Sequence, residues 1–234
     1  MAMQQSILEE IRNYTFQNKE LLNSHHFLFG CPIQKNMKST DVIILGKNPG
    51  GDPKKDFRKT LFNEPFPTEE SSDYDFIESD LGKKRIRHDW SIKMLKITGL
   101  SNLLFSECFF WNSKNEGKAF QDRFGYSFLN NPHWDFCTKK NIELFDLHHP
   151  KLILVTSSAK EFVDVVAKKY KLIFESLLKL TPNSRGQSTF IHHYNWNNIP
   201  FIFIPHPNYQ AIEAARLQIK DYIKSTLQEG MKKF

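Results

Sequence analysis

The stretch VIILGKNPGGDP, residues 42–53, joins a short apolar run to a turn that is rich in glycine and proline. The run VIIL is continuous and apolar, which is typical of a strand buried on both faces. In the turn, Gly50 and Gly51 permit close approach of the backbone, and Pro49 makes it stiff. The pattern therefore predicts that Asn48 is held rigidly at the end of a buried strand.

The turn does not match two common phosphate-binding patterns. Its spacing fits neither G-x-x-x-x-G-K-[ST] nor G-x-G-x-x-G. An ordinary exit from a strand, in which Asn48 only caps local backbone groups, explains this turn equally well when it is considered alone. Whether Asn48 has a structural or a functional role therefore depends on the other segments of the chain.

Three further apolar runs resemble the first, and each ends in small or polar residues. They are LLFSECFFWN (103–112), KLILVTSS (151–158) and IPFIFIPHPN (199–208). Helical patterns lie between most of the runs, for example at 135–147 and 159–170. Apolar strands that alternate with helices indicate a parallel sheet covered on both faces. The sequence therefore predicts an α/β fold, a three-layer α/β/α sandwich with a central four-stranded parallel sheet, in a single domain over residues 1–234.

Other segments complete the expected organisation. Helices are expected at 3–24, 89–98 and 209–229, and a short hairpin or edge strand at 188–198. The segment 52–89 is rich in Pro, Ser and charged residues and is expected to be irregular. It contains the basic cluster GKKRIRH, which is either a solvated loop or a phosphate contact.

The composition suits a soluble protein with a polyanionic partner. The chain of 234 residues has 32 Lys and Arg against 26 Asp and Glu, a net charge of +6, which suits nucleic acid. The three cysteines form no C-x-x-C pair, which argues against a disulfide scaffold, a zinc site or an iron–sulfur cluster. No signal peptide and no membrane-spanning run is expected. We expect a cytoplasmic monomer.

In an open α/β sheet, ligands bind beyond the carboxyl ends of the strands. Those ends are the four turns GKNPGGDP, WNSKN, TSSA and PHPN. His206 lies between two prolines, which limit its freedom, although a histidine there also fits a structural role. Asn112 offers both a donor and an acceptor to a planar polar ligand. We therefore expect Asn48, Asn112 and His206 to converge at one edge of the sheet, without an acidic cluster that would hold a metal.

These motifs resemble those of the uracil-DNA glycosylase superfamily, and they occur in the same order. GKNPGGDP resembles the first motif, especially the G-x-N-P-G form of the mismatch-specific and single-strand-selective branches. FIFIPHPN resembles the second motif, which usually ends in H-P-S. ECFFWNSKN lies where the family has a strand ending in the uracil-reading Asn, and KLILVTSSAKEF resembles the third strand. The matches span roughly residues 41–212.

The resemblance implies an enzyme that flips a nucleotide out of DNA and hydrolyses the bond between base and sugar, with no metal and no cofactor. Asn48 would position the attacking water, and His206 would donate a hydrogen bond to the departing base. Asn112 would pair with the base edge, and the backbone near Gly46 and Lys47 would line the pocket. Lys47 could also contact phosphate.

The resemblance also implies a stacking aromatic and a set of DNA contacts. Phe62 would stack on the base, with Phe57 and Phe66 as alternatives. DNA contacts would come from two of the turns, namely from Ser157, Ser158, Asn208, Tyr209 and Gln210. A side chain from the loop after His206, where Tyr209 and Gln210 stand, would fill the gap left by the flipped nucleotide.

Two departures from the family leave other functions open. Asn208 stands where the family has Ser, and the segment 52–89 matches no branch closely. One alternative is a non-catalytic member of the superfamily that binds DNA or a nucleobase. Another is an α/β hydrolase acting on a free nucleoside or nucleotide, which would not need the basic cluster at 82–88.

Overall fold

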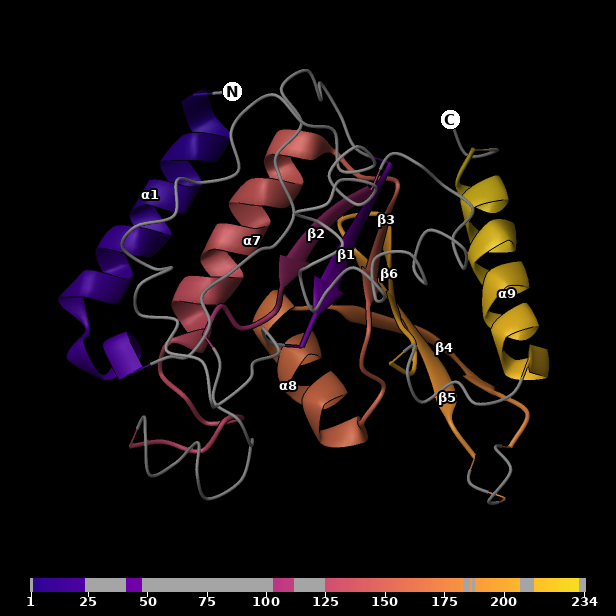
Figure 1. Ribbon diagram of the computed structural model, residues 1–234. Coiled ribbons are helices and arrows are strands. Elements are labelled where there is room, and N and C mark those ends of the chain that lie inside the picture. The colour runs from indigo at the N-terminus through magenta and orange to yellow at the C-terminus, as the bar shows by residue number, and fades with distance from the viewer. Residues whose placement is uncertain are drawn as a thin grey trace, which may run out of the picture.

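The computed structural model describes residues 2–23, 41–47, 103–111, 125–182, 186, 188–206 and 213–231. The helices there are α1 (Ala2–Gln17), the 3-10 helix η1 (Lys19–Asn23), α7 (Trp134–His148), α8 (Lys160–Tyr170) and α9 (Glu213–Met231). The strands are β1 (Val42–Gly46), β2 (Leu103–Glu107), β3 (Leu152–Val155), β4 (Ile173–Lys179), β5 (Phe190–Trp196) and β6 (Ile199–Phe203). Figure 1 shows how these elements are arranged.

One six-stranded sheet in the order β2-β1-β3-β6-β5-β4 forms the centre of the molecule. β1 pairs in parallel with both β2 and β3, and β3 pairs in parallel with β6. β5 pairs antiparallel with β6 and with β4. The sheet is therefore mixed, and it differs from the expected sheet of four parallel strands because β5 and β4 extend it with an antiparallel edge.

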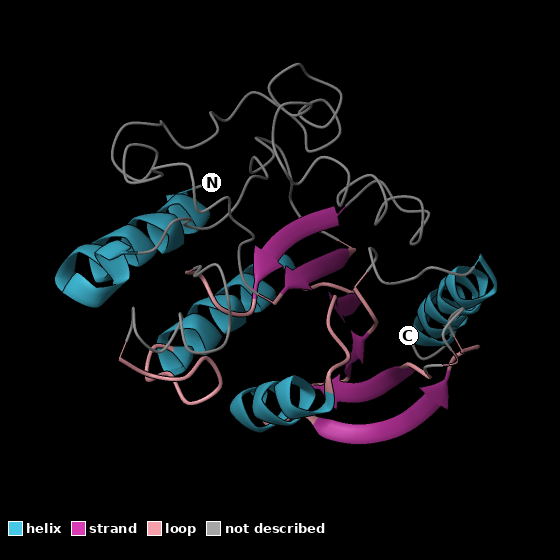
Figure 2. Ribbon diagram, turned by 60° about the horizontal axis from the view of Figure 1, so that its bottom comes forward, coloured by secondary structure: helices cyan, strands magenta, loops and turns pink. Residues whose placement is uncertain are grey.

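Helices cover both faces of the sheet, which confirms the α/β class (Figures 1 and 2). Alternate residues of each central strand point to opposite faces. Ile43, Ile153 and Phe201 belong to the core shared with α1, α7 and α8. Ile44, Leu154 and Ile202 belong to the core shared with α9. Because both faces are buried, the central strands consist of continuous apolar runs rather than alternating ones.

Most of the expected elements within the described residues are present. The strand expected near 41–46 and the helices expected at 135–147 and 159–170 correspond to β1, α7 and α8. The helix expected at 3–24 ends at Gln17 and is followed by η1, and the final helix begins at Glu213. The irregular segment 52–89 and the helix expected at 89–98 lie outside the described residues.

One expectation about a strand was wrong, and one observed strand was not expected. The strand expected at 103–112 ends at Glu107, because residues 108–111 leave the ladder and pack their side chains into the core. β4 was not expected at all. All seven of its residues are exposed, so its sequence IFESLLK lacks the apolar alternation that identifies a half-buried strand.

None of the helices in the described part of the chain combines the length and the apolarity required to cross a bilayer.

Candidate functional site at the carboxyl ends of the strands

The order of the strands reverses at β1, so the sheet has a topological switch point there. The chain passes from β1 to β2 on one side, and β3 then lies on the other side of β1. In open α/β sheets, such a switch point is where ligands bind, beyond the carboxyl ends of the strands. The residues that follow Gly46 and Val155 therefore flank the candidate site.

Backbone hydrogen bonds align the ends of three strands. Thr156 N–H donates to the Leu45 carbonyl at 2.9 Å, and Ile204 N–H donates to the Val155 carbonyl at 2.8 Å. Thr156 is buried, and its hydroxyl also donates to the Leu45 carbonyl. The strands β1, β3 and β6 therefore end side by side, and the residues that follow them leave the sheet at the same edge.

Several predicted site residues lie at this edge. Ser157 and Ser158 follow β3 and are half-buried, as is His206 after β6. The pairing of Val155 with Phe203 puts Ser158 and His206 each three positions beyond the last paired residue of their strands. The structure thus brings the predicted serines and the predicted histidine to the same edge of the sheet.

Gly46 ends β1 in close contact with a buried carboxylate that the sequence did not single out. Glu107 is only 2% exposed, although it carries a carboxyl group. A Cβ atom at position 46 would lie 2.0 Å from Oε2 of Glu107, which is far inside any permitted contact. Glycine is therefore required at this position so that the Glu107 carboxylate can lie against the end of β1.

The side chain of Lys47 lies between two aromatic rings. Its Nζ is 5.2 Å from the ring centroids of both Phe128 and Phe162. A cation over the faces of aromatic rings is stabilised by their quadrupoles. The resemblance implies that the backbone of Lys47 lines the pocket. The side chain of Lys47 is held against the loop before α7 and the first turns of α8.

His192 is a second residue near this edge that the sequence did not single out. It lies on β5 opposite Phe203, and its half-buried imidazole hydrogen-bonds to the backbone of Ser158. Burial lowers the pKa of His192, while that hydrogen bond and the charge of Asp164 oppose the shift. His192 therefore links the antiparallel edge of the sheet to the turn after β3.

Buried aromatic residues anchor the segment that leads from β2 to Asn112. Phe109, Phe110 and Trp111 are each at most 1% exposed. Phe109 N–H donates to the Lys47 carbonyl at 3.1 Å, and Trp111 Nε1 donates to the Thr15 hydroxyl at 2.9 Å. The chain is thus fixed up to the residue that precedes Asn112.

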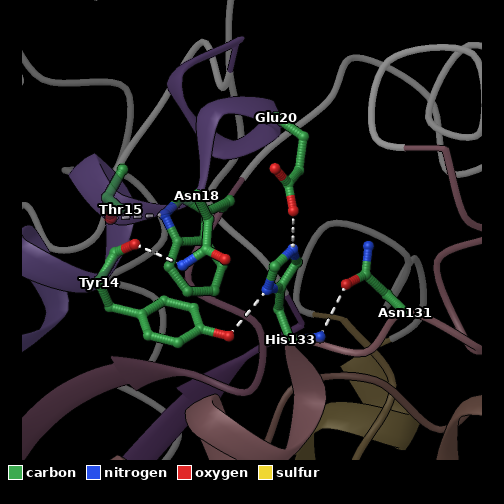
Figure 3. A network of polar contacts seen from close by, with 7 residues as sticks. Tyr14, Thr15, Asn18, Glu20, Asn131 and His133 are labelled. Atoms are coloured by element: carbon green, nitrogen blue, oxygen red, sulfur yellow. Dashed lines mark hydrogen bonds and ion pairs between the residues drawn. The ribbon is translucent and has the colours of Figure 1, made fainter.

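A polar network lies beside Trp111, and Figure 3 shows its members. The imidazole of His133 contacts the Tyr14 hydroxyl through Nδ1 at 2.9 Å and the Glu20 carboxylate through Nε2 at 3.0 Å. A carboxylate only accepts, so Nε2 carries the proton and Nδ1 of the neutral ring accepts from Tyr14. Burial lowers the pKa of His133, and Glu20 opposes this shift. The network fixes one tautomer and joins α1 and η1 to the start of α7.

The described cysteines do not have the properties of nucleophiles. Cys108 and Cys137 are fully buried free thiols. Burial raises the pKa of each thiol, in Cys108 against the opposing charge of Lys47. Thiolate chemistry is therefore suppressed at both residues at neutral pH. Within the described residues, no group of three or more His, Cys, Asp or Glu is placed to hold a metal.

The remaining predicted site residues cannot be located at this edge. They lie outside the described residues and are Asn48, Phe62, Asn112, Asn208, Tyr209 and Gln210, together with the alternatives Phe57 and Phe66. The two residues missed from the sequence had only weak signals. Glu107 is a lone acidic residue in an apolar run, and a buried charge of that kind needs an explanation. His192 could not be distinguished from its neighbour His193 without the register of β5.

Comparison with known proteins finds no match, either among the models of protein families or among curated sequences. What the chain does must therefore be inferred from its motifs and from the geometry of the strand ends.

Proposed function

We propose that the chain is a DNA glycosylase with a uracil-DNA glycosylase-like fold, which removes uracil or a related damaged base from DNA and leaves an abasic site. The parallel pairs that connect β2, β1, β3 and β6 suit that fold. The single observation that carries the proposal is the common level of Ser158 and His206 at the edge next to the switch point.

The number of residues beyond the last paired residue of each strand also supports a role for Asn48 at this edge. Leu45 pairs with Val155, and Asn48 is the third residue after Leu45 in the sequence. Ser158 is likewise the third residue after Val155. Equal distances in sequence from paired residues favour a shared edge for the asparagine of the first motif and the histidine of the second.

In the proposed reaction, a water molecule adds to C1′ of the sugar while the bond between C1′ and the base nitrogen breaks. The electron pair of that bond leaves with the base. The added water then loses a proton to solvent, and the departing base takes up a proton from solvent. Asn48 orients the water, and His206 donates a hydrogen bond to the base carbonyl where the negative charge develops. A sugar with cationic character needs a well-placed water more than a strong base, so asparagine suffices.

The proposed reading of the base depends on Asn112. Its amide offers a donor and an acceptor that match the edge of uracil and mismatch that of cytosine. The buried residues Phe109 to Trp111 support this role because they hold the preceding backbone against α1 and the end of β1. Phe62 is the proposed stacking residue, and Ser157, Ser158, Asn208, Tyr209 and Gln210 are the proposed DNA contacts.

A cleavage assay tests the proposal. Labelled single-stranded and double-stranded DNA containing uracil, hypoxanthine or xanthine is incubated with the protein, and abasic sites are then cleaved with alkali. We expect product with at least one base. Absence of product with every base would reject the enzyme, and DNA binding without product would favour the non-catalytic alternative.

Two substitutions test the assigned roles. Asn48→Ala and His206→Ala should each lower the rate by about 10²-fold or more, since each removes a group that acts in the transition state. His149→Asn is the matched control, because His149 is exposed in a left-handed conformation after α7, which asparagine tolerates. Full activity in both alanine variants would show that these residues do not have the proposed roles.

A further inference from the structure

β4 is an exposed edge of the sheet. In the described part of the chain it pairs only with β5, and it ends the strand order. Its large apolar side chains are open to solvent, with Ile173 67%, Phe174 57%, Leu177 51% and Leu178 38% exposed. Figure 1 shows β4 and β5 as a hairpin at the end of the sheet far from α1. Natural proteins usually protect such an edge, because it is a template for another strand.

Both faces of β4 carry apolar groups. Phe174 packs edge-on against Tyr194 with ring centroids 5.4 Å apart, and Leu177 lies opposite His192 on the same face. Leu178 lies opposite Ile191, which belongs to the core under α9. An added strand would therefore cover apolar surface on both sides of the sheet as well as pairing its backbone groups.

The sequence of β4 is complementary to itself in the antiparallel direction. If two copies pair with Leu177 opposite Leu177, then Glu175 of each copy lies opposite Lys179 of the other. Opposite charges in directly facing positions stabilise a strand pair, whereas like charges destabilise it. A shift of the register by two residues loses both charge pairs, so the sequence also specifies the register.

A bulge in β4 makes Glu175 accessible for this pairing. The ladder with β5 joins Phe174 to Tyr194 and Ser176 to His193, and its register shifts between them. Glu175 therefore has no opposing residue on β5, and both Glu175 and Lys179 are exposed. Their charges are available to a second copy without first breaking the hairpin.

We propose that β4 is a dimerisation edge, which pairs antiparallel with β4 of a second copy of this chain about a twofold axis at Leu177. Such a contact is isologous and closes at two copies, so it does not propagate into filaments. It replaces the expectation of a monomer. One strand pair is small compared with a standard interface, so the dimer is weak and depends on concentration. The candidate site beside β1 and β3 stays open.

Sedimentation velocity of the full chain over a range of concentrations tests the dimer. The wild type should shift from monomer to dimer as the concentration rises. Glu175→Lys and Lys179→Glu should each weaken the dimer at least tenfold, because each creates two facing pairs of like charge. An equal mixture of the two variants should form a mixed dimer again, because the two lysines of one chain then face the two glutamates of the other.

Two controls separate pairing from folding and from net charge. Lys139→Glu changes an exposed charge on α7, far from β4, and should leave dimerisation unchanged. Leu177→Thr keeps a residue suited to a strand and should weaken the dimer without lowering the unfolding midpoint. A wild type that remains monomeric, single variants that dimerise like the wild type, or a mixture that stays monomeric would each overturn the proposal.

Discussion

At the scale of single residues, Gly46 and Glu107 depend on each other. A side chain at position 46 would displace the Glu107 carboxylate, because the added Cβ would lie 2.0 Å from Oε2. Gly46→Ala should therefore lower the free energy of unfolding by about 1–3 kcal/mol, a typical cost of overpacking. Urea denaturation measures this loss.

A double-mutant cycle identifies the cause. In a Glu107→Ala background the contact is absent, so Gly46→Ala should cost markedly less than in the wild type. Effects of the two substitutions that simply add would show that the strain at Gly46 does not come from Glu107.

His148 predicts a pH dependence of stability. It is 2% exposed at the end of α7, and neither ring nitrogen has a hydrogen-bond partner among the described residues. Burial lowers the pKa of His148 from 6.5 to about 4, with the charge of His149 acting in the same direction. The unfolded chain binds a proton below about pH 6.5 and the folded chain only near pH 4. Stability is therefore lost as the pH falls from 6.5 to 4.

His148→Leu should remove this part of the pH dependence. Between about pH 7 and pH 5 the wild type should lose about 2 kcal/mol more unfolding free energy than the variant. At neutral pH the variant should be at least as stable, since it buries no unsatisfied nitrogen. Denaturation curves at the two pH values make the comparison, and an equal loss in both proteins would contradict the assignment to His148.

At the scale of elements, Asn141 joins one strand to two helices. Its Nδ2 donates to the Glu107 carbonyl at 2.8 Å and to the Tyr170 hydroxyl at 2.9 Å, and its Oδ1 accepts from the Ser106 hydroxyl at 2.7 Å. All of these groups are buried. Asn141 thus holds β2 and α8 against α7.

Asn141→Ala should destabilise the protein by about 2–4 kcal/mol, because it leaves several buried polar groups without partners. Thermal or chemical unfolding measures the change. Asn130→Ala, at an exposed position before α7, is the control and should change the stability by less than about 0.5 kcal/mol. Equal effects of the two substitutions would mean that water replaces the lost partners.

The elements that the sequence predicted are those whose burial leaves a clear pattern. β1 and β3 are apolar throughout, and α8 has apolar residues at helical spacing, so their types follow from sequence alone. The end of β2 did not follow, because aromatic residues continue the apolar run for packing reasons after the ladder ends. β4 did not follow because all seven of its residues are exposed, so its sequence lacks the alternation of buried and exposed positions that identifies a strand.

The candidate site was predictable to a similar extent. The rule that ligands bind at strand ends led to His206, Ser157 and Ser158, which do lie at one edge. Glu107 and His192 could not be found in this way, since their positions depend on the register between neighbouring strands. The roles of all the predicted site residues, including Asn48, Asn112 and His206, remain predictions.

At the scale of the whole molecule, the net charge of +6 suits the DNA partner that we propose, because DNA is a polyanion. Lys83, Lys84 and Arg85 belong to the basic cluster, which lies outside the described residues. If all three contact phosphates, replacing them with Gln should reduce the slope of log affinity against log salt concentration by about 0.9 for each contact. Fluorescence anisotropy of labelled DNA gives this slope.

A matched triple variant separates local contacts from total charge. Lys139, Lys168 and Lys224 are exposed on three different helices, and replacing them with Gln removes the same charge. This variant should keep the slope of the wild type. An unchanged slope in the variant of the basic cluster would show that the cluster does not contact the phosphates.

The adjacency of β1 and β2 has a consequence for the diversification of this scaffold. Residues 47–102 connect two strands that are locked together in register, from Val42 opposite Leu103 to Gly46 opposite Glu107. The entropy of closing a long connection grows only with the logarithm of its length, about 0.6 kcal/mol for each doubling. Natural or engineered exchange of this connection should therefore cost the paired strands little stability, which leaves the sequence between them open to diversification.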